Sequence, residues 1–95
     1  MNPDLKAELK RLRKRRFYYL SSRIPEGAWR DGDGKIQAID LMDIGHLQAC
    51  IRLIDKDVPS LDANLVSSAA RKRLSAQAAS KRSELHAVFK RKSLL

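Results

Sequence analysis

The chain has 95 residues, of which 33% are charged and 43% hydrophobic, and its formal net charge is +9. This length suits a single domain over residues 1–95 with a modest core. One cysteine, Cys50, excludes an intrachain disulfide and disfavours a cysteine-rich zinc site. Because the sequence has neither an apolar run that spans a bilayer nor the apolar core of a signal peptide, we expect a cytoplasmic protein with no membrane contact.

The charge is distributed unevenly along the chain. Residues 1–23 hold eight Lys or Arg against two Asp or Glu, residues 24–60 hold four against seven, and residues 61–95 hold eight against two. Two basic ends therefore flank a mildly acidic middle. Such a layout favours binding to a phosphate polymer or to an acidic protein face.

A basic helix is predicted within residues 1–23, over positions 3–22. Pro3 suits the first helical position, and Asn2 before it suits the N-cap. The helix must end before Pro25 and Gly27. Its apolar side is formed by leucines at helical spacing, which are Leu5, Leu9 and Leu12.

Six of the seven residues at 10–16 are cationic, and three aromatic residues follow directly. Cations at this density on a helix can contact successive phosphates, and a neighbouring tyrosine can stack on a base or hydrogen-bond a phosphate. The alternative is a solvated face with Phe17 and Tyr19 in the core. The predicted contact residues in this region are Lys10, Arg11, Arg13, Lys14, Arg15, Arg16 and Tyr18.

A hairpin followed by a helix is predicted over residues 28–57. The sequence Asp-Gly-Asp-Gly at 31–34 is a strong turn signal between two short strands that lie within 28–41. Asp43 suits the N-cap of a helix over 44–56. The apolar stripe of that helix comprises Ile44, Leu47, Ile51 and Ile54.

Three alternative interpretations of this region involve a metal or catalysis. The turn partly matches a calcium-binding loop, but Trp29 stands where the first ligand belongs. His46 and Cys50 share a helical face and could supply two metal ligands, but no second pair is present. With Asp43 they also supply the residue types of a catalytic site, yet residues so close on one helix rarely converge on a substrate. We therefore predict no metal, no cofactor and no enzymatic activity.

A long basic helix is predicted over residues 60–92, capped by Ser60 or Asp62. At about 1.5 Å per residue it exceeds the width of a compact domain of this size, so it must project, break or pack on another molecule. We consider three roles for it, namely a phosphate-binding stripe, an ordinary packing helix, and a homodimer contact through its small residues. The predicted contact residues are Arg71, Lys72, Arg73, Lys81 and Arg82.

Within residues 29–54, a tryptophan is followed at fixed intervals by further distinctive residues. The spacing Trp-x4-Gly-x4-Ile-x2-Met-x3-His-Leu resembles a group of small proteins encoded by phages and prophages. The resemblance covers about a quarter of the chain, implies a hairpin followed by an apolar helix, and implies no activity. The matching positions are Trp29, Asp33, Gly34, Ile39, Met42, His46, Leu47, Ile51, Arg52 and Leu53.

This segment departs from the group's pattern at two positions. Ala49 stands where those proteins often carry Asn, and Gln37 stands where they often carry an apolar residue. We expect Trp29 and Met42 to cover the base of the hairpin, and His46 to face it from the first turn of the helix. The roles assigned to Trp29, Gly34, Met42, His46 and Leu47 are therefore structural.

Together these features predict a mainly α protein (α+β class) with three helices and one short hairpin between the first two. The leading functional hypothesis is a small phage-type accessory or regulatory protein that binds DNA or RNA in the cytoplasm of a bacterial host. A second hypothesis is an inhibitor of a host factor, such as an anti-CRISPR or other anti-defence protein, that binds an acidic protein surface or a guide RNA. A third is a homo-oligomeric structural protein.

Overall fold

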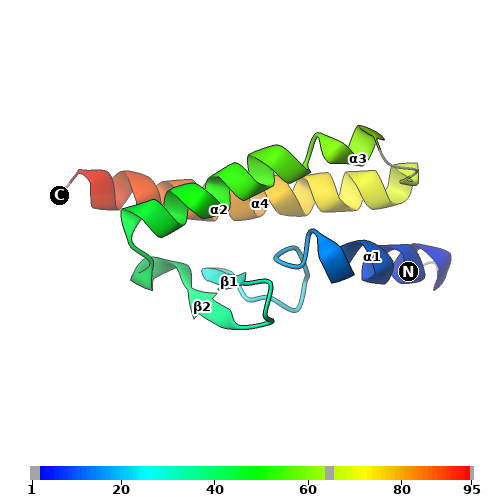
Figure 1. The fold of residues 1–95 in the computed structure, drawn as a ribbon, viewed down its shortest axis with the longest axis horizontal. Helices are drawn as coiled ribbons and strands as arrows, with labels where there is room; N and C mark the ends of the chain where they lie inside the picture. The colour runs from blue at the N-terminus through cyan, green and yellow to red at the C-terminus, as the bar shows by residue number, and fades with distance from the viewer. Residues whose placement is uncertain (1–2, 64–65, 95) are drawn as a thin grey trace.

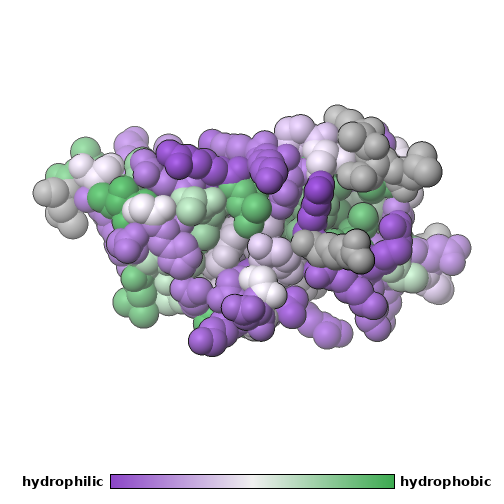
Figure 2. Space-filling model, viewed as in Figure 1, coloured by the Kyte–Doolittle hydropathy of each residue, from purple (hydrophilic) through white to green (hydrophobic). Residues whose placement is uncertain are grey.

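The computed structural model describes residues 3–63 and 66–94, apart from the side chains of Arg15, Asp62 and Ala63. Among the helices in these residues, none is both long and apolar enough to cross a membrane. Hydrophilic side chains cover most of the face shown in Figure 2, and the hydrophobic residues visible there lie in separate groups.

The fold is organised around its longest helix, α4 (Ser68–Ser93), which runs through most of a molecule measuring 46 × 23 × 20 Å. α2 (Ile44–Asp57) packs antiparallel along one side of α4 (Figure 1). α1 (Pro3–Arg15) and the hairpin lie on the other side. The predicted mainly α architecture, with a hairpin between the first two helices, is confirmed.

The hairpin consists of β1 (Ala28–Arg30) and β2 (Ile36–Ala38), followed by a 3-10 turn, η1 (Ile39–Leu41). Its strands pair antiparallel with Trp29 opposite Gln37. Gly34 has a φ of 88°, which side chains rarely allow, and its N–H donates to the Asp31 carbonyl over 3.0 Å. This is the three-residue loop in which a turn is followed by a left-handed residue. The predicted turn is therefore confirmed.

α2 begins where the sequence predicts. The Asp43 side chain accepts a hydrogen bond from the His46 N–H over 2.8 Å, so Asp43 is the N-cap. The helix ends at Asp57, one residue beyond the predicted end. The apolar residues that the hairpin and α2 contribute to the core are Trp29, Ile39, Met42, Leu47, Cys50 and Ile54.

The prediction of one continuous helix over 60–92 is wrong. The chain forms a short helix, α3 (Ser60–Ala63), before α4 begins with Ser67 as its N-cap. The Ser67 hydroxyl accepts from the Ala70 N–H over 3.2 Å, and the Ser67 N–H donates to Glu8 of α1 over 2.8 Å. Hydrogen bonds from Ser67 hold the pKa of Glu8 below its usual value. The side chain of Asp62, the alternative cap, lies outside the described part of the chain.

The small and apolar row along α4 packs within the chain. Ala70, Leu74, Ala78 and Leu85 are all buried, and α2 makes the most extensive contact with α4. A homodimer through this row would need a surface that the fold already covers. A homodimer therefore stays a prediction, and it would have to form through other faces of α4.

The first helix is shorter than predicted. It ends at Arg15 rather than continuing to residue 22, because Phe17 adopts a left-handed backbone conformation with a φ of 59°. Phe17 is nevertheless only 2% exposed, so burial of its ring holds this backbone in place. Three successive turns then lead to β1, closed by N–H donation from Leu20, Ile24 and Ala28 to the carbonyls three residues earlier. Asn2, the predicted N-cap, lies outside the described residues.

Phe17 gives a stability test of this helix end. We expect Phe17→Ala to lower the free energy of unfolding by about 3–5 kcal/mol through loss of a buried ring. Phe17→Gly should be less destabilising than Phe17→Ala by about 1 kcal/mol, because glycine adopts positive φ without a steric penalty. Urea denaturation followed by circular dichroism measures both. Ala7 lies at an exposed position inside α1, so in the matched control Ala7→Gly the glycine should instead destabilise the protein. If Phe17→Gly were less stable than Phe17→Ala, the left-handed backbone conformation of residue 17 would be contradicted.

A buried aromatic cluster joins the chain after α1 to the hairpin and α2. The Tyr19 ring is fully buried and stacks on Trp29 with a centroid separation of 4.5 Å. Its hydroxyl donates to the Asp57 carboxylate over 2.7 Å, and Asp57 is itself only 5% exposed. Burial, followed by the hydrogen bond and the charge of Asp57, raises the pKa of Tyr19.

The neighbouring tyrosines allow a matched test of this bond. We expect Tyr19→Phe to lower the free energy of unfolding by about 1.5–3 kcal/mol, because it leaves a buried carboxylate without its donor. Tyr18→Phe should change stability little, since no hydrogen bond of the Tyr18 hydroxyl is found among the described residues. Thermal melts of both variants check this. Equal losses for the two would contradict a specific role for the Tyr19–Asp57 bond.

Candidate functional site

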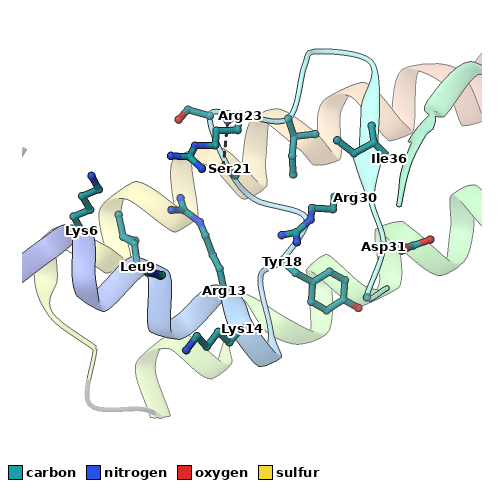
Figure 3. A pocket seen from close by; sticks show the side chains of 14 residues that line it. Lys6, Leu9, Arg13, Lys14, Tyr18, Ser21, Arg23, Arg30, Asp31 and Ile36 are labelled. Carbon is teal, nitrogen blue, oxygen red and sulfur yellow. Dashed lines mark hydrogen bonds between the residues drawn. The ribbon is translucent and has the colours of Figure 1, made fainter. Parts of the chain in front are cut away.

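A cleft of about 990 Å³ lies between α1 and the hairpin. Its walls come from α1 on one side and the strands on the other, and the turns after α1 close it (Figure 3). Six cationic side chains and one carboxylate line it, together with a tyrosine and three aliphatic residues. The lining comprises Lys6, Leu9, Lys10, Arg13, Lys14, Tyr18, Ser21, Ser22, Arg23, Ile24, Arg30, Asp31, Gly32 and Ile36. We call this feature the basic cleft.

The α1 wall of the basic cleft is a stripe of cations. Lys6, Lys10, Arg13 and Lys14 stand at positions i, i+4, i+7 and i+8, which share one side of a helix. The stripe borders Leu9, whose side chain is 1% exposed and attaches this side of α1 to the core. Lysines four residues apart rise about 6 Å per step along the helix axis.

Arg13 is the cation in the stripe that the fold holds in one position. Its Nε donates to the Leu20 carbonyl, and Nη2 donates to Gln77 Oε1 of α4 over 2.8 Å. Partial burial lowers the pKa of Arg13, and the nearby positive charge of Arg73 lowers it further. An arginine remains charged at neutral pH regardless. The fold therefore keeps two like charges close together, an arrangement that a bound anion would stabilise.

The hairpin wall presents one cation and one aliphatic side chain as a cross-strand pair. Arg30 pairs directly opposite Ile36, and both line the basic cleft, while Trp29, the residue before Arg30 in β1, is buried in the core. Figure 3 shows Arg30 and Arg13 reaching from opposite walls into the same space. Ile36 is 56% exposed, so an apolar side chain lies at the opening of a mainly cationic cleft.

Asp31 is the carboxylate in the cleft lining, and the turn uses it. Its Oδ1 accepts from the N–H groups of Asp33 and Lys35, each over 2.9 Å, and its Oδ2 accepts from Gln37 over 3.2 Å. Desolvation opposes ionisation, but these hydrogen bonds outweigh it and lower the pKa of Asp31. This use of Asp31 accounts for the residues that partly matched a calcium-binding loop.

Tyr18 lines the basic cleft beside Gly32 of the hairpin turn. It is half-buried, and its ring meets Tyr19 edge-on at a centroid separation of 5.4 Å. Burial raises the pKa of Tyr18, and the charges of Asp57 and Asp31 act in the same direction, so the phenol is neutral at physiological pH. Its ring end lies 3.7 Å from where a Cβ on Gly32 would stand. Tyr18 thus offers a neutral aromatic surface between two cationic walls.

The cations of α4 are arranged differently from those of the cleft. Arg82 forms a bidentate ion pair with Asp55 of α2, at 2.7 and 3.1 Å, and Arg91 pairs with Asp40 of η1 at 2.6 Å. None of the six cleft cations forms an ion pair within the described part of the chain. The positive charge of the cleft is therefore uncompensated, whereas much of that on α4 is paired.

Lys81 was predicted to contact a partner, but the fold buries its side chain. It is only 7% exposed, and its ammonium donates to the Ala28 carbonyl over 2.8 Å and to the Pro25 carbonyl over 3.4 Å. It also pairs with Glu84 at 3.0 Å, and Glu84 in turn accepts from the Gly27 N–H. Lys81 therefore attaches the start of the hairpin to α4 and is a structural residue.

The structure separates the other predicted contact residues into groups. Lys10, Arg13, Lys14 and Tyr18 line the basic cleft. Five others are exposed outside the cleft, namely Arg11, Arg16, Lys72, Arg73 and Arg82. Arg71 is half-buried, and its Nη2 donates to the Val66 carbonyl. The side chain of Arg15 lies outside the described part of the chain.

Three cleft cations were missed by the sequence analysis. Lys6 precedes Lys10 by four residues, and this spacing could have identified it. Arg23 and Arg30 come from a turn and a strand, and no sequence pattern links them to α1 before the fold is known.

The residues considered for a metal site are separate from the cleft. Cys50 is buried, and burial raises its pKa to about 11, so the thiol is protonated at neutral pH. His46 is half-buried at the start of α2. No cluster of three or more metal-ligating residues occurs among the described residues. Comparison of the chain with protein-family models, with curated proteins and with solved structures finds no match.

Lys81 and Arg82 are adjacent cations on α4, and they allow a test of how much a buried and an exposed charge each contribute to stability. We expect Lys81→Met to lower the free energy of unfolding by about 2–4 kcal/mol, because it removes the ammonium that donates to the carbonyl of the buried Ala28 and pairs with Glu84. Arg82→Met removes an exposed ion pair and should change stability little. Urea denaturation at neutral pH compares them. A small effect of Lys81→Met would contradict its structural assignment.

Proposed function

We propose that the protein binds nucleic acid through the basic cleft, as a small accessory or regulatory protein. The observation that carries the proposal is the lining of the cleft, where six cations without carboxylate partners among the described residues face one hydrogen-bonded carboxylate. Phosphate groups supply the complementary charge, and contacts to phosphate provide most of the affinity of nonspecific nucleic-acid binding. The phage or prophage origin that the resemblance implies forms part of this proposal.

The shape of the site also favours a polymer over a small anion. The lysines of α1 form a row rather than a closed ring, and Arg23 and Arg30 extend the positive charge across the cleft. A single small anion would contact only part of this row. A polyphosphate backbone, with a charge at every repeat, can contact several of these cations together.

The dependence of affinity on salt concentration tests this proposal. The binding constant for a labelled oligonucleotide is measured by fluorescence anisotropy, and its logarithm should fall linearly with the logarithm of the salt concentration. With six phosphate contacts to a single strand the slope should be about −4, since each contact contributes about −0.7. Absence of binding at low salt would overturn the proposal.

Paired variants locate the interaction within the molecule. We expect Lys10→Gln with Lys14→Gln to lower affinity by about 10- to 30-fold at low salt and to make the slope shallower by about 1.4. Lys56→Gln with Lys90→Gln removes the same charge from exposed lysines outside the cleft and should change both quantities much less. Equal effects of the two double variants would show that net charge, rather than the cleft, binds the nucleic acid.

A further inference from the structure

We propose that the ligand of the basic cleft is a single-stranded nucleic acid, and that one unpaired base packs on Tyr18 between the two cationic walls. This inference rests on the proposed function and adds to it a ligand class and a base-contacting residue. It starts from a part of the lining that phosphate contacts leave unexplained, which consists of Leu9, Tyr18, Ile24 and Ile36.

The three lysines of the cleft and most of its apolar residues differ in exposure, whereas Arg13 is half-buried and Ile36 is exposed. Lys6, Lys10 and Lys14 are exposed, whereas Tyr18 is half-buried and Leu9 and Ile24 are buried. A strand whose phosphates follow the exposed lysines would therefore direct its bases toward the inner, apolar part. Combining a positive groove with an aromatic surface is the arrangement by which proteins bind single strands.

Duplex DNA fits this geometry poorly. Proteins read or follow a duplex with elements that project into a groove, such as an exposed helix or a β-ribbon. Here the cations line a concave space between α1 and the hairpin, and Arg13 and Tyr18 are half-buried within it. A base can reach Tyr18 only when it is unpaired and turned away from its neighbours.

Tyr18 is held in place to receive a base. Its ring packs against the buried Tyr19, which stacks on Trp29 and bonds to Asp57. Tyrosine is uncharged at neutral pH, and burial raises the pKa of Tyr18 further. Little conformational freedom would thus be lost when a base packs against it. Ile36, more than half exposed on the opposite wall, offers an apolar contact at the opening of the cleft.

The test compares single strands with duplex for the wild-type protein and three Tyr18 variants. Anisotropy titrations use oligo(dT), oligo(U), a duplex of the same length, and an abasic strand that has the phosphates but no bases. We expect tighter binding of single strands than of the duplex. Tyr18→Phe should bind within about twofold of wild type, whereas Tyr18→Leu and Tyr18→Ala should lose about fivefold to a hundredfold, the value of one stacked base.

Two controls separate the base contact from general effects. The salt slope should be the same in Tyr18→Leu and wild type, since no charge is removed. The abasic strand should bind wild type and Tyr18→Leu equally, because the base and the ring form one interacting pair that either change removes. Preference between oligo(dT) and oligo(U) identifies which of the two single-stranded ligands is bound more tightly.

A cross-linking experiment on the wild-type protein keeps the test independent of variant folding. Irradiation of the complex with a strand carrying 5-iodouracil should join a base to Tyr18, and peptide mass spectrometry locates the bond. Duplex binding as tight as single-strand binding, full affinity of Tyr18→Leu, or cross-links only outside the cleft would each overturn the inference and leave the proposed function standing. Failure of every nucleic acid to bind would instead overturn the proposed function.

Discussion

The hydrogen bond between Tyr19 and Asp57 fixes how the two sides of the molecule meet. Both groups are buried, so the carboxylate depends on the phenol for a donor, and the Tyr19 ring is held against Trp29. One side chain thereby connects the segment after α1, the first strand and the end of α2. Because Tyr19 points into the core, its neighbour Tyr18 lies in the basic cleft instead. The same short segment thus contributes Tyr19 to the core and Tyr18 to the candidate site.

Carboxylates from the acidic middle of the sequence pair with part of the positive charge on α4. Asp55 and Asp40, both from that middle, pair with Arg82 and Arg91 of α4. Lys81 is buried with partners in the hairpin and on its own helix. The cations of α1 that line the cleft have no carboxylate partners among the described residues. Net charge alone does not distinguish these cases, because it counts a paired arginine and an unpaired one equally.

Local signals made the hairpin and α2 predictable from sequence, since the Asp-Gly-Asp-Gly turn and the Asp43 cap act on residues close to them. The end of α1 was not predictable, because Phe17 is left-handed only when the core buries its ring. Ser67 had no mark in the sequence that separated it from other serines of the expected helix. Lys81 looked like its neighbour Arg82, and burial alone separates them. The sequence analysis named some of the cleft residues on and after α1, but it predicted no cleft, because the opposite wall depends on tertiary contacts.

Those tertiary contacts place the cleft walls without using most of the charged groups that line the cleft. α1 is attached to α4 through Glu8 and Ser67, and the hairpin is attached to α4 through Lys81 and Glu84. Arg13 is the exception, since it both lines the cleft and bonds to Leu20 and Gln77. Changes at Lys10 or Lys14 should therefore act on binding with little effect on the fold. A change at Arg13 alters the wall and the charge together, so its effect on affinity cannot be assigned to charge alone.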